Sequence, residues 1–465
     1  QWDARGHAKG RMAPGGWICR VTPDGQSWEV VSSGYRNEYD IGMNPEGELF
    51  AYDADMEWDI GSPWYRPTRL CHAVSGSEFG WRSGTGKWPT YYEDSLPPVV
   101  EIGPGSPTGV IFGTEAKFPS KYQQAVYMLD WTFGTIYAVH MTPEGASYKG
   151  VKEEFVSGSP LAVTDTVIGA DGAFYFTVGG RGTQSALYRV YYDGKESTKK
   201  TSRKESKDTI NARKLRRSLE KFHGKQNKKA VDTAWPYLGH EDRFIRFAAR
   251  IAIENQPVSE WRRLALEESD PQAAAIALIA LARQGDEGSQ EDLLKALAKF
   301  DIMKVDESIA LGLLRAYALS FTRMGRPDQQ TIDAVTTRLN PHLPTQSDNI
   351  NTELVRLLVY LDAPGIIEKG MDLLADSRPP RIPEWAELLK RNSGYGGTIQ
   401  RMLDNHPPIQ KINYALMLRN VRYGWSMEQR EQYFSFINEA ATHTGGASYE
   451  GFLNNIRDEA LTNCS

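Results

Sequence analysis

Alternating carboxylates within residues 53–59 are the clearest sign of chemistry in this chain. They stand at every second position, namely Asp53, Asp55, Glu57 and Asp59. A calcium loop presents oxygen ligands in the same way, at its positions 1, 3 and 5. Trp58 and Trp64 stand where an EF-hand has its Gly and its bidentate Glu. A calcium site outside the EF-hand pattern is therefore one interpretation of this run.

Two other interpretations of the acidic run remain open. On an extended strand the four carboxylates would share one face, with Met56, Trp58 and Ile60 on the opposite, inward face. Like charges on one face repel each other, and Arg66 and Arg69 follow closely enough to neutralise them. The run is then either an arginine-paired structural cluster or a plain solvated face.

A second candidate is the pair Arg36 and Asn37, which directly precedes an expected inner strand. An arginine can hold an anionic group through two parallel hydrogen bonds, so ligand binding is one interpretation. The other is that Arg36 ties neighbouring sheets together. Asp40 recurs at an equivalent repeat position as Asp165, and this repetition favours a structural role for both aspartates.

Other residue types with catalytic potential are scattered. The eight histidines show no H-x-H or H-x-x-x-H spacing. His72 and His140 are the better candidates for a general base, because both lie in expected strands. The three cysteines form no C-x-x-C-H motif, so we expect no covalently bound haem in this chain. The sequence also contains no Gly-x-Ser-x-Gly elbow, P-loop or Rossmann fingerprint.

The composition excludes several classes of protein. A net charge of −5 over 465 residues gives no general attraction to nucleic acid. No apolar run reaches the roughly 18 residues that a membrane span needs. Lys195 to Lys229 is locally basic, which we interpret as a solvated linker entering a helix, with an anion-binding patch as the alternative. No signal peptide opens the chain, so we expect it to start inside a larger protein.

The elements that carry these residues change character near residue 195. A strand that closes in a Pro-Asp-Gly or Pro-Glu-Gly turn occurs at 16–25 and 134–145, and a shorter copy at 186–194. Pro presets φ and Gly accepts positive φ, so each unit predicts a strand and a hairpin. Short strands with glycine-rich joins are typical of propeller blades, of roughly 40–50 residues each. We predict a partial β-propeller of the six-bladed type at residues 1–194.

After a basic linker at 195–208, residues 209–465 show a helical period. Apolar side chains between Phe244 and Ala252 recur at i, i+3, i+4 and i+7. Asp270-Pro271 has the form of an N-cap followed by a first-turn proline. Helices of about 10–15 residues with short loops are typical of HEAT-like stacked pairs, which present a concave surface. The predicted fold class is a multidomain β + α chain, a partial propeller followed by a HEAT-like α-helical solenoid.

Several segments of the first part resemble known proteins. The Gly-x-Arg-Asn, Gly-Glu-Leu and Gly-x-x-Tyr-Gly-Trp motifs of soluble glucose and sorbosone dehydrogenase propellers are matched by residues 34–37, 43–50 and 76–81. The large multidomain membrane-bound dehydrogenase-like or haem-binding proteins of Planctomycetes-type bacteria are matched by residues 53–61, 63–69 and 179–183. In that group, helical repeats and a cytochrome c domain follow the propeller. The cytochrome c domain has no counterpart in this sequence.

The resemblance implies that Arg36 and Asn37 help to bind pyrroloquinoline quinone. The family's cofactor lysine corresponds to the segment 132–134, which is Thr-Phe-Gly here, and two family arginines correspond to Ala162 and Thr164. The family's catalytic histidine lies upstream of anything that matches. Most of the quinone site is therefore not retained, and the cofactor is not assigned from the sequence.

Two functions follow from these observations. The resemblance implies a fragment of an exported, periplasmic quinoprotein-like oxidoreductase that acts on sugars or related alcohols or aldehydes. It would pass electrons to a haem domain or cytochrome c partner outside this chain, with calcium as a candidate metal. The alternative is a non-catalytic propeller-plus-solenoid scaffold that binds glycans or proteins. Because propellers host both kinds of function, the fold does not choose between them.

Overall fold

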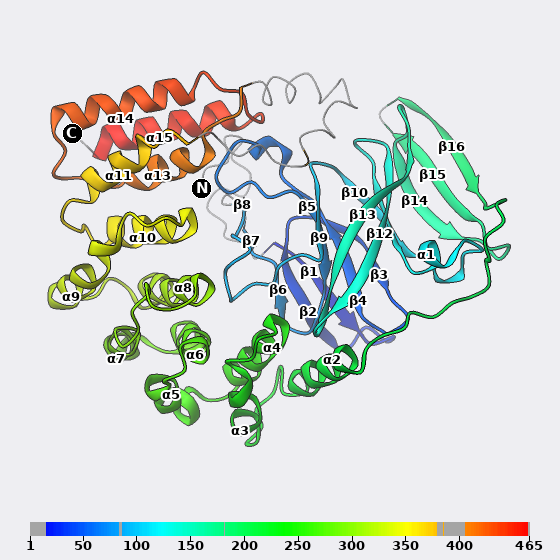
Figure 1. The fold of residues 1–465 in the computed structure, drawn as a ribbon, viewed down its shortest axis with the longest axis horizontal. Coiled ribbons are helices and arrows are strands. Elements are labelled where there is room, and N and C mark those ends of the chain that lie inside the picture. Colours follow the sequence, from blue (N-terminus) through cyan, green and yellow to red (C-terminus); the bar gives the residue numbers. More distant parts are fainter. Residues whose placement is uncertain (1–14, 83–85, 181, 379–384, 386–404, 464–465) are drawn as a thin grey trace.

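The computed structural model describes residues 15–82, 86–180, 182–378, 385 and 405–463. Strands make up the first part of the chain and helices the second (Figure 1). The last strand ends at Val190 and the first long helix begins at Lys207. The β + α fold class is confirmed, whereas the boundaries 1–194, 195–208 and 209–465 remain predictions.

Four sheets of three or four strands follow one another along the first part. The first sheet contains β1 (Gly16–Val21), β2 (Trp28–Tyr35) and β6 (Ser77–Glu78). The second contains β3 (Glu38–Met43), β4 (Leu49–Asp53), β5 (Thr68–His72) and β9 (Val100–Gly103). The third contains β10 (Pro107–Phe112), β11 (Val126–Asp130), β12 (Thr135–Glu144) and β13 (Ser147–Ser157). The fourth contains β14 (Val163–Ile168), β15 (Phe174–Gly180) and β16 (Thr183–Val190).

The pairing within these sheets is antiparallel, except that β2 and β6 run parallel. A separate two-stranded ribbon joins β7 (Trp81–Arg82) to β8 (Gly86–Lys87). The first strand of the third sheet, β10, packs beside both β3 and β14, which are the first strands of the neighbouring sheets. The second, third and fourth sheets therefore meet along their first strands. Figure 1 shows these sheets side by side.

The predicted hairpin turns explain the short connections between strands. In the turn between β1 and β2, the Gly25 amide donates to the Thr22 carbonyl at 2.8 Å, and Gly25 has a φ of +71°. The Pro-Glu-Gly turn joins β12 to β13 in the same way, with Glu144 opposite Ser147. Only glycine adopts positive φ without strain, so both turns depend on it. Both of these hairpins are confirmed.

The second part is a succession of helices. They are α2 (Lys207–Glu220), α3 (Ala230–Ala234), α4 (Arg243–Glu254), α5 (Val258–Glu267), α6 (Pro271–Gln284), α7 (Gln290–Leu297), α8 (Glu307–Met324), α9 (Gln329–Leu339), α10 (Asp348–Tyr360), α11 (Ile366–Leu374), α13 (Ile409–Leu418), α14 (Met427–Ala440) and α15 (Tyr449–Asn463). The predicted N-cap is confirmed, since the Asp270 carboxylate accepts from the Ala273 amide at 2.8 Å. None of the described helices is long and apolar enough to cross a membrane.

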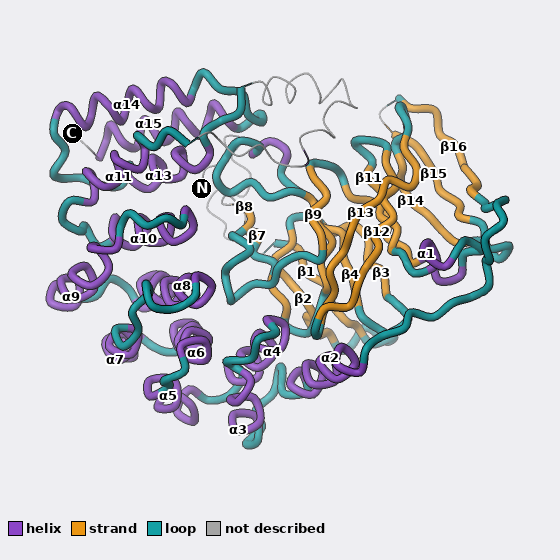
Figure 2. Tube along the Cα trace, viewed as in Figure 1, coloured by secondary structure: helices purple, strands orange, loops and turns teal. Residues whose placement is uncertain are grey.

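The helices form two rows. The inner row consists of α2, α4, α6, α8 and α10, each packed against the next, while α3, α5, α7 and α9 lie on the outer side (Figure 2). The inner row curves around the β part of the molecule (Figure 1). Apolar residues of both parts share one interior, in which Tyr35 and Phe79 of the β part belong to the same buried cluster as Leu278 and Tyr317 of α6 and α8.

Candidate functional site

The residues predicted to do chemistry gather at one end of the second sheet. We call this end the rim, and define it by Arg36, Asn37, Asp53 and Asp55 together with the residues that contact them. β3 begins there and β4 ends there, because the two strands run antiparallel with Glu38 opposite Asp53. The rim therefore brings the Arg-Asn pair and the start of the acidic run into contact, although about 16 positions separate them in the sequence.

Asp53 is the buried centre of the rim. Its Oδ1 accepts hydrogen bonds from the backbone amides of Arg36 and Asn37 at 2.8 and 3.2 Å. Its Oδ2 lies 3.1 Å from Arg69 Nε and 3.2 Å from Lys87 Nζ. Burial alone would raise the pKa of Asp53, but Lys87 and Arg69 hold that pKa below its usual value. For Asp53 the structure thus shows an ion-paired structural carboxylate.

One of the two arginines predicted to neutralise the acidic run does so. Arg69 pairs with Asp53, as described, and also donates to the Phe79 carbonyl at 2.6 Å. Arg66 instead donates to backbone carbonyls, those of Pro63 at 3.0 Å and Tyr65 at 2.7 Å. The second cation on Asp53 is Lys87, which comes from β8 and was not predicted. Burial lowers the pKa of Lys87 to about 8, although Asp53 favours its charged form.

Asp55 is buried with one oxygen unused. Its side chain is 1% exposed, and Oδ2 accepts a hydrogen bond from the Tyr65 hydroxyl at 2.7 Å. Oδ1 has no hydrogen-bond partner among the residues that the structure describes. Burial raises the pKa of Asp55 to about 8, although the Tyr65 hydrogen bond and the nearby charges of Lys87 and Arg36 favour the carboxylate. Asp55 can therefore hold or release a proton near neutral pH.

The remaining acidic residues leave the strand. β4 ends at Asp53, and Glu57–Asp59 form a short 3-10 turn. The extended-strand interpretation of the run, and with it a shared carboxylate face, is therefore wrong. So is the plain solvated face, because Asp53 and Asp55 are buried. Asp59 Oδ2 accepts from Trp64 Nε1 at 3.0 Å.

The calcium interpretation gains no support from this geometry. Within the described part of the chain, no group of three or more His, Cys, Asp or Glu side chains is arranged to hold a metal ion. The one carboxylate at the centre of the rim is already balanced by two cations, Arg69 and Lys87. Calcium binding by Asp53, Asp55, Glu57 and Asp59 stays a prediction.

Arg36 and Asn37 share a structural backbone role, and the Arg36 side chain has additional hydrogen-bond donors. Their amides hold the turn before β3 onto Asp53, so the backbone of both residues has a structural role. The Arg36 guanidinium makes a long contact of 3.6 Å with Met56 Sδ, and the ion pairs of the described residues include none with Arg36. Its donors lie half-buried near Asp55, available to a ligand. A role for these two residues in cofactor binding stays a prediction.

The rim arrangement repeats in the next sheet. Asp130 ends β11 as Asp53 ends β4, and its Oδ1 accepts from the amides of Ser106 and Thr132 at 2.8 and 3.0 Å. Burial raises the pKa of Asp130 to about 7, although these amides favour the carboxylate. Sequence reasoning missed Asp130. Its signal was an aspartate closing the second strand of each unit, in Leu-Phe-Ala-Tyr-Asp at 49–53 and Val-Tyr-Met-Leu-Asp at 126–130.

The repeated aspartates Asp40 and Asp165 occupy matching first strands, β3 and β14. Asp40 Oδ1 accepts from the Ile41 amide and Asp165 Oδ1 from the Thr166 amide, both at 2.8 Å. Asp40 Oδ2 also accepts from the Val110 amide of β10 at 2.7 Å, which fastens the second sheet to the third. The structural role predicted for Asp40 is confirmed by this contact.

Both candidate histidines contact a carboxylate, and in His72 both ring nitrogens have a partner. His72 is buried, with Nδ1 2.9 Å from Ser147 Oγ and Nε2 2.7 Å from Glu48 Oε2. Burial lowers the pKa of His72 to about 4, so the ring is neutral and both nitrogens are engaged. His140 Nε2 lies 2.7 Å from Glu153 Oε2. His72 is a structural residue.

Comparisons with known proteins give only remote likenesses. No protein-family model matches this chain, and no curated protein matches it. An oxidoreductase (glucose dehydrogenase) from Thermus thermophilus is 20% identical over 35% of this chain and 47% of its own, with a TM-score of 0.27. The quinone (PQQ)-bound form of an aldose sugar dehydrogenase from Streptomyces coelicolor is 18% identical over 38% of this chain and 51% of its own, with a TM-score of 0.28.

A further glucose dehydrogenase is 17% identical over 37% of this chain and 50% of its own, with a TM-score of 0.29. This chain thus spans about half the length of the solved structures that it matches. At these scores the likeness assigns no activity, so the function has to be argued from the rim.

Proposed function

We propose that this chain is the sugar-binding portion of a dehydrogenase-like oxidoreductase, and that a sugar or a related alcohol or aldehyde binds at the rim between Arg36 and Asp55. The observation that carries the proposal is the unused Oδ1 of the buried Asp55. A buried polar atom without a partner costs about 1–3 kcal/mol, so such an atom calls for an explanation. A hydroxyl group of a bound ligand would supply the missing hydrogen bond.

The two side chains complement each other chemically. A ligand hydroxyl can donate to the Asp55 carboxylate while a neighbouring oxygen accepts from the Arg36 guanidinium, as polyols with adjacent oxygens allow. Oxidation of an alcohol also needs a group that takes up the hydroxyl proton. Asp55, with its pKa raised to about 8 by burial, is suited to exchange that proton near neutral pH.

The rim does not fit a cofactor that carries several carboxylates, such as pyrroloquinoline quinone. Of its three cations, Arg69 and Lys87 are committed to Asp53 and to the carbonyls of Phe79 and Pro67. Of these three cations, Arg36 is the one that makes no ion pair among the residues that the structure describes. The oxidant is therefore proposed to bind outside this rim, and electrons to pass to a haem domain or cytochrome c outside this chain.

The architecture belongs to the same proposal. We take the four sheets to be blades of a propeller of the six-bladed type, since the first strands of three of them lie side by side, and the two rows of helices to be a HEAT-like solenoid. Export of the protein to the periplasm is a further part of this proposal.

A non-catalytic scaffold that binds glycans is the second candidate. It is favoured by a specific observation, the commitment of Arg69 and Lys87 to Asp53, because this removes two cations that a quinone site would use. The scaffold would use the same Arg36 and Asp55 contacts to hold its ligand.

Calorimetry with D-glucose, D-galactose and D-xylose on the purified chain tests the binding site. At pH 9, where Asp55 is ionised, we expect Arg36→Ala and Asp55→Asn each to weaken binding by about tenfold, the value of a lost charged hydrogen bond. Arg20→Ala is the matched control, because Arg20 pairs with Glu29 at the surface of the first sheet. Absence of sugar binding by the wild-type chain would show that the proposal is wrong.

A dye-reduction assay separates the two candidates. The chain is supplied with the sugar that binds, with added pyrroloquinoline quinone and Ca²⁺, and with an artificial electron acceptor. Reduction of the dye that is lost in Asp55→Asn supports the oxidoreductase, whereas sugar binding without dye reduction supports the scaffold.

A further inference from the structure

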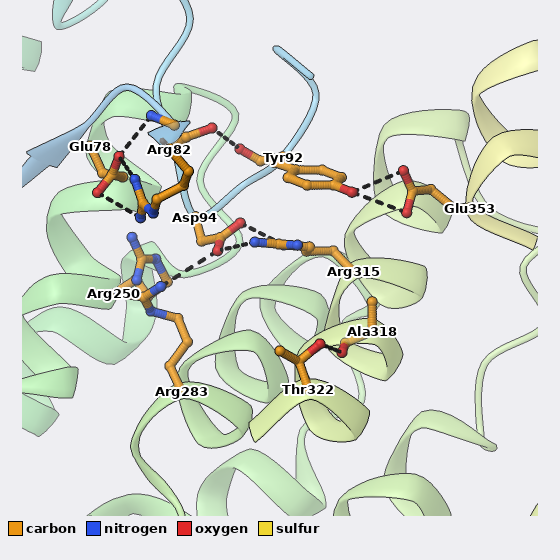
Figure 3. A network of polar contacts seen from close by, with 12 residues as sticks. Glu78, Arg82, Tyr92, Asp94, Arg250, Arg283, Arg315, Ala318, Thr322 and Glu353 are labelled. Atoms are coloured by element: carbon orange, nitrogen blue, oxygen red, sulfur yellow. Dashed lines mark hydrogen bonds and ion pairs between the residues drawn. The ribbon is translucent and has the colours of Figure 1, made fainter. Parts of the chain in front are cut away.

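The inner row of helices already binds a peptide segment, and that segment belongs to this chain. Residues 88–96 follow the β7–β8 ribbon, and Figure 3 shows Tyr92 and Asp94 of this segment beside Glu353 and Arg315 of the inner helices. The Asp94 carboxylate accepts two hydrogen bonds from Arg315 of α8, at 2.9 and 2.8 Å. Glu93 accepts from Arg246 of α4 at 3.0 Å. Acidic side chains of the segment are thus paired with arginines of two inner helices, α4 and α8.

Aromatic rings of the same segment are recognised as well. The Arg315 guanidinium lies 3.9 Å from the ring centre of Tyr92 and 4.7 Å from that of Trp88. The Tyr91 hydroxyl donates to Glu353 of α10 at 2.8 Å, and the Tyr92 hydroxyl to the same carboxylate at 3.1 Å. The helices therefore recognise an acidic, tyrosine-containing peptide through arginines that pair with its carboxylates and cover its rings.

Directly beside this contact lies a hollow of about 580 Å³ that the segment does not fill. Arg356 belongs to both places, because it pairs with Glu353 at 2.8 Å, donates to the Tyr92 hydroxyl and lines the hollow. The hollow is also lined by Arg326, Tyr360, Asp362, Arg422 and Tyr423, which follow or end α8, α10 and α13.

The hollow carries the same residue types as the occupied contact. Its three arginines face one acid, Asp362, which Arg326 already pairs at 2.7 Å. Arg422 is exposed and has no ion-pair partner among the residues that the structure describes. Tyr423 is 84% exposed, whereas the ring of Tyr360 stacks on Phe321 and has the Arg326 guanidinium 5.5 Å from its centre. The net positive charge and the exposed Tyr423 ring both favour an acidic, aromatic occupant.

We propose that this hollow, the Arg422 groove, binds an acidic, tyrosine-containing segment of a partner protein. The chemistry is the one that the neighbouring inner helices already use on Tyr91-Tyr92-Glu93-Asp94: arginines pair with carboxylates, and tyrosine rings pack against guanidinium groups. This site is separate from the rim, so its occupancy does not depend on the proposed sugar binding.

Fluorescence anisotropy with a labelled nine-residue peptide of the sequence of residues 88–96 tests the groove on the full chain. We expect saturable binding that Arg422→Glu weakens by about tenfold or more, since a charge-assisted hydrogen bond is replaced by repulsion. Tyr423→Ala is expected to weaken it as well. The matched control is Arg263→Glu on α5, which makes the same charge change at an exposed site and should leave affinity within about twofold.

Two comparisons make the result decisive. A peptide with Gln and Asn in place of its two acids should bind at least about tenfold more weakly. Equal binding of this neutral peptide, or unchanged binding to Arg422→Glu, would overturn the proposal. Tighter binding of a twelve-residue oligothymidylate, weakened to the same extent by Arg422→Glu, would overturn it in favour of a nucleic-acid site. Thermal melting of each variant confirms that the fold is intact.

Discussion

Replacing Asp94 by Asn removes the charge at the centre of the contact between the β part and the inner row of helices. Asp94 is fully buried, and its carboxylate is held by Arg315 at 2.8 and 2.9 Å and approached by Arg283 at 3.5 Å (Figure 3). The Asn side chain keeps the shape and one acceptor oxygen. It also turns an amide toward guanidinium donors and leaves the largely buried Arg315 without its counter-charge, whereas Arg283 keeps its ion pair with Glu254 at 2.9 Å.

The magnitude follows from this burial. Removing one partner of a buried pair costs about 3–5 kcal/mol, because the other charge stays behind uncompensated. Because Asn keeps one acceptor oxygen, we expect Asp94→Asn to lower the free energy of unfolding by about 3 kcal/mol, near the lower end of this range. For a chain of this size we expect roughly 2 °C per kcal/mol, and hence a Tm lowered by about 6 °C.

The pH dependence has a definite sign. Burial would raise the pKa of Asp94, but Arg315 and Arg283 hold that pKa well below its usual range. The unfolded chain therefore binds this proton more tightly than the folded chain. The stabilisation is complete above the ordinary Asp pKa of 3.8 and is lost as the pH falls below it. The difference between wild type and Asp94→Asn should consequently shrink in acid.

Urea unfolding followed by circular dichroism at pH 7 and at pH 3 measures both effects. Asp193→Asn is the control, since Asp193 is exposed and its substitution should change stability by less than about 0.5 kcal/mol. Combining Asp94→Asn with Arg315→Gln should cost less than the sum of the single changes, as expected for residues in contact. If Asp94→Asn is as stable as Asp193→Asn, the buried contact does not hold the two parts together.

Three further outcomes are expected. Glu48→Gln should lower the free energy of unfolding, measured in urea at pH 7, by about 3 kcal/mol. Burial would raise the pKa of Glu48, but His72 and Arg216 hold that pKa at about 2, so the stabilisation fades as the pH falls from about 4.5 toward 2. An unchanged urea midpoint would contradict this pairing. Asp55→Asn should gain stability relative to the wild type as the pH rises from about 4 to about 8, because burial raises the pKa of Asp55 to about 8 and over this range the unfolded chain releases a proton that the folded chain keeps; a variant that loses stability relative to the wild type over this range would refute this. EDTA should leave Tm unchanged, since Asp53 is already paired with cations, and a rise of several degrees on adding Ca²⁺ would instead support a metal at residues 53–59.

Local signals in the sequence predicted local structure correctly. The turn at Gly25 and the cap at Asp270 form within three residues, so the residue types that they need are adjacent in the chain. Strands and helices differ in the spacing at which apolar side chains recur, and a single segment displays that spacing by itself. The order of strands followed by helices could therefore be predicted. The pairing of Arg69 with Asp53 was one of three interpretations, and it became visible because β4 and β5 are neighbouring strands.

The sequence by itself determined the two kinds of secondary structure, their turns and caps, and the acidic run that begins at the rim. Only the tertiary structure decided what those residues do. Lys87 reaches Asp53 from a different strand pair, and Arg315 reaches Asp94 across 221 positions. The spacing of apolar residues shows which face of a helix or strand is buried. It does not show which other element covers that face, because the hydrophobic effect is non-directional. A buried charge is tolerated only where the fold supplies its partner, and for Asp94 that partner comes from the other half of the chain.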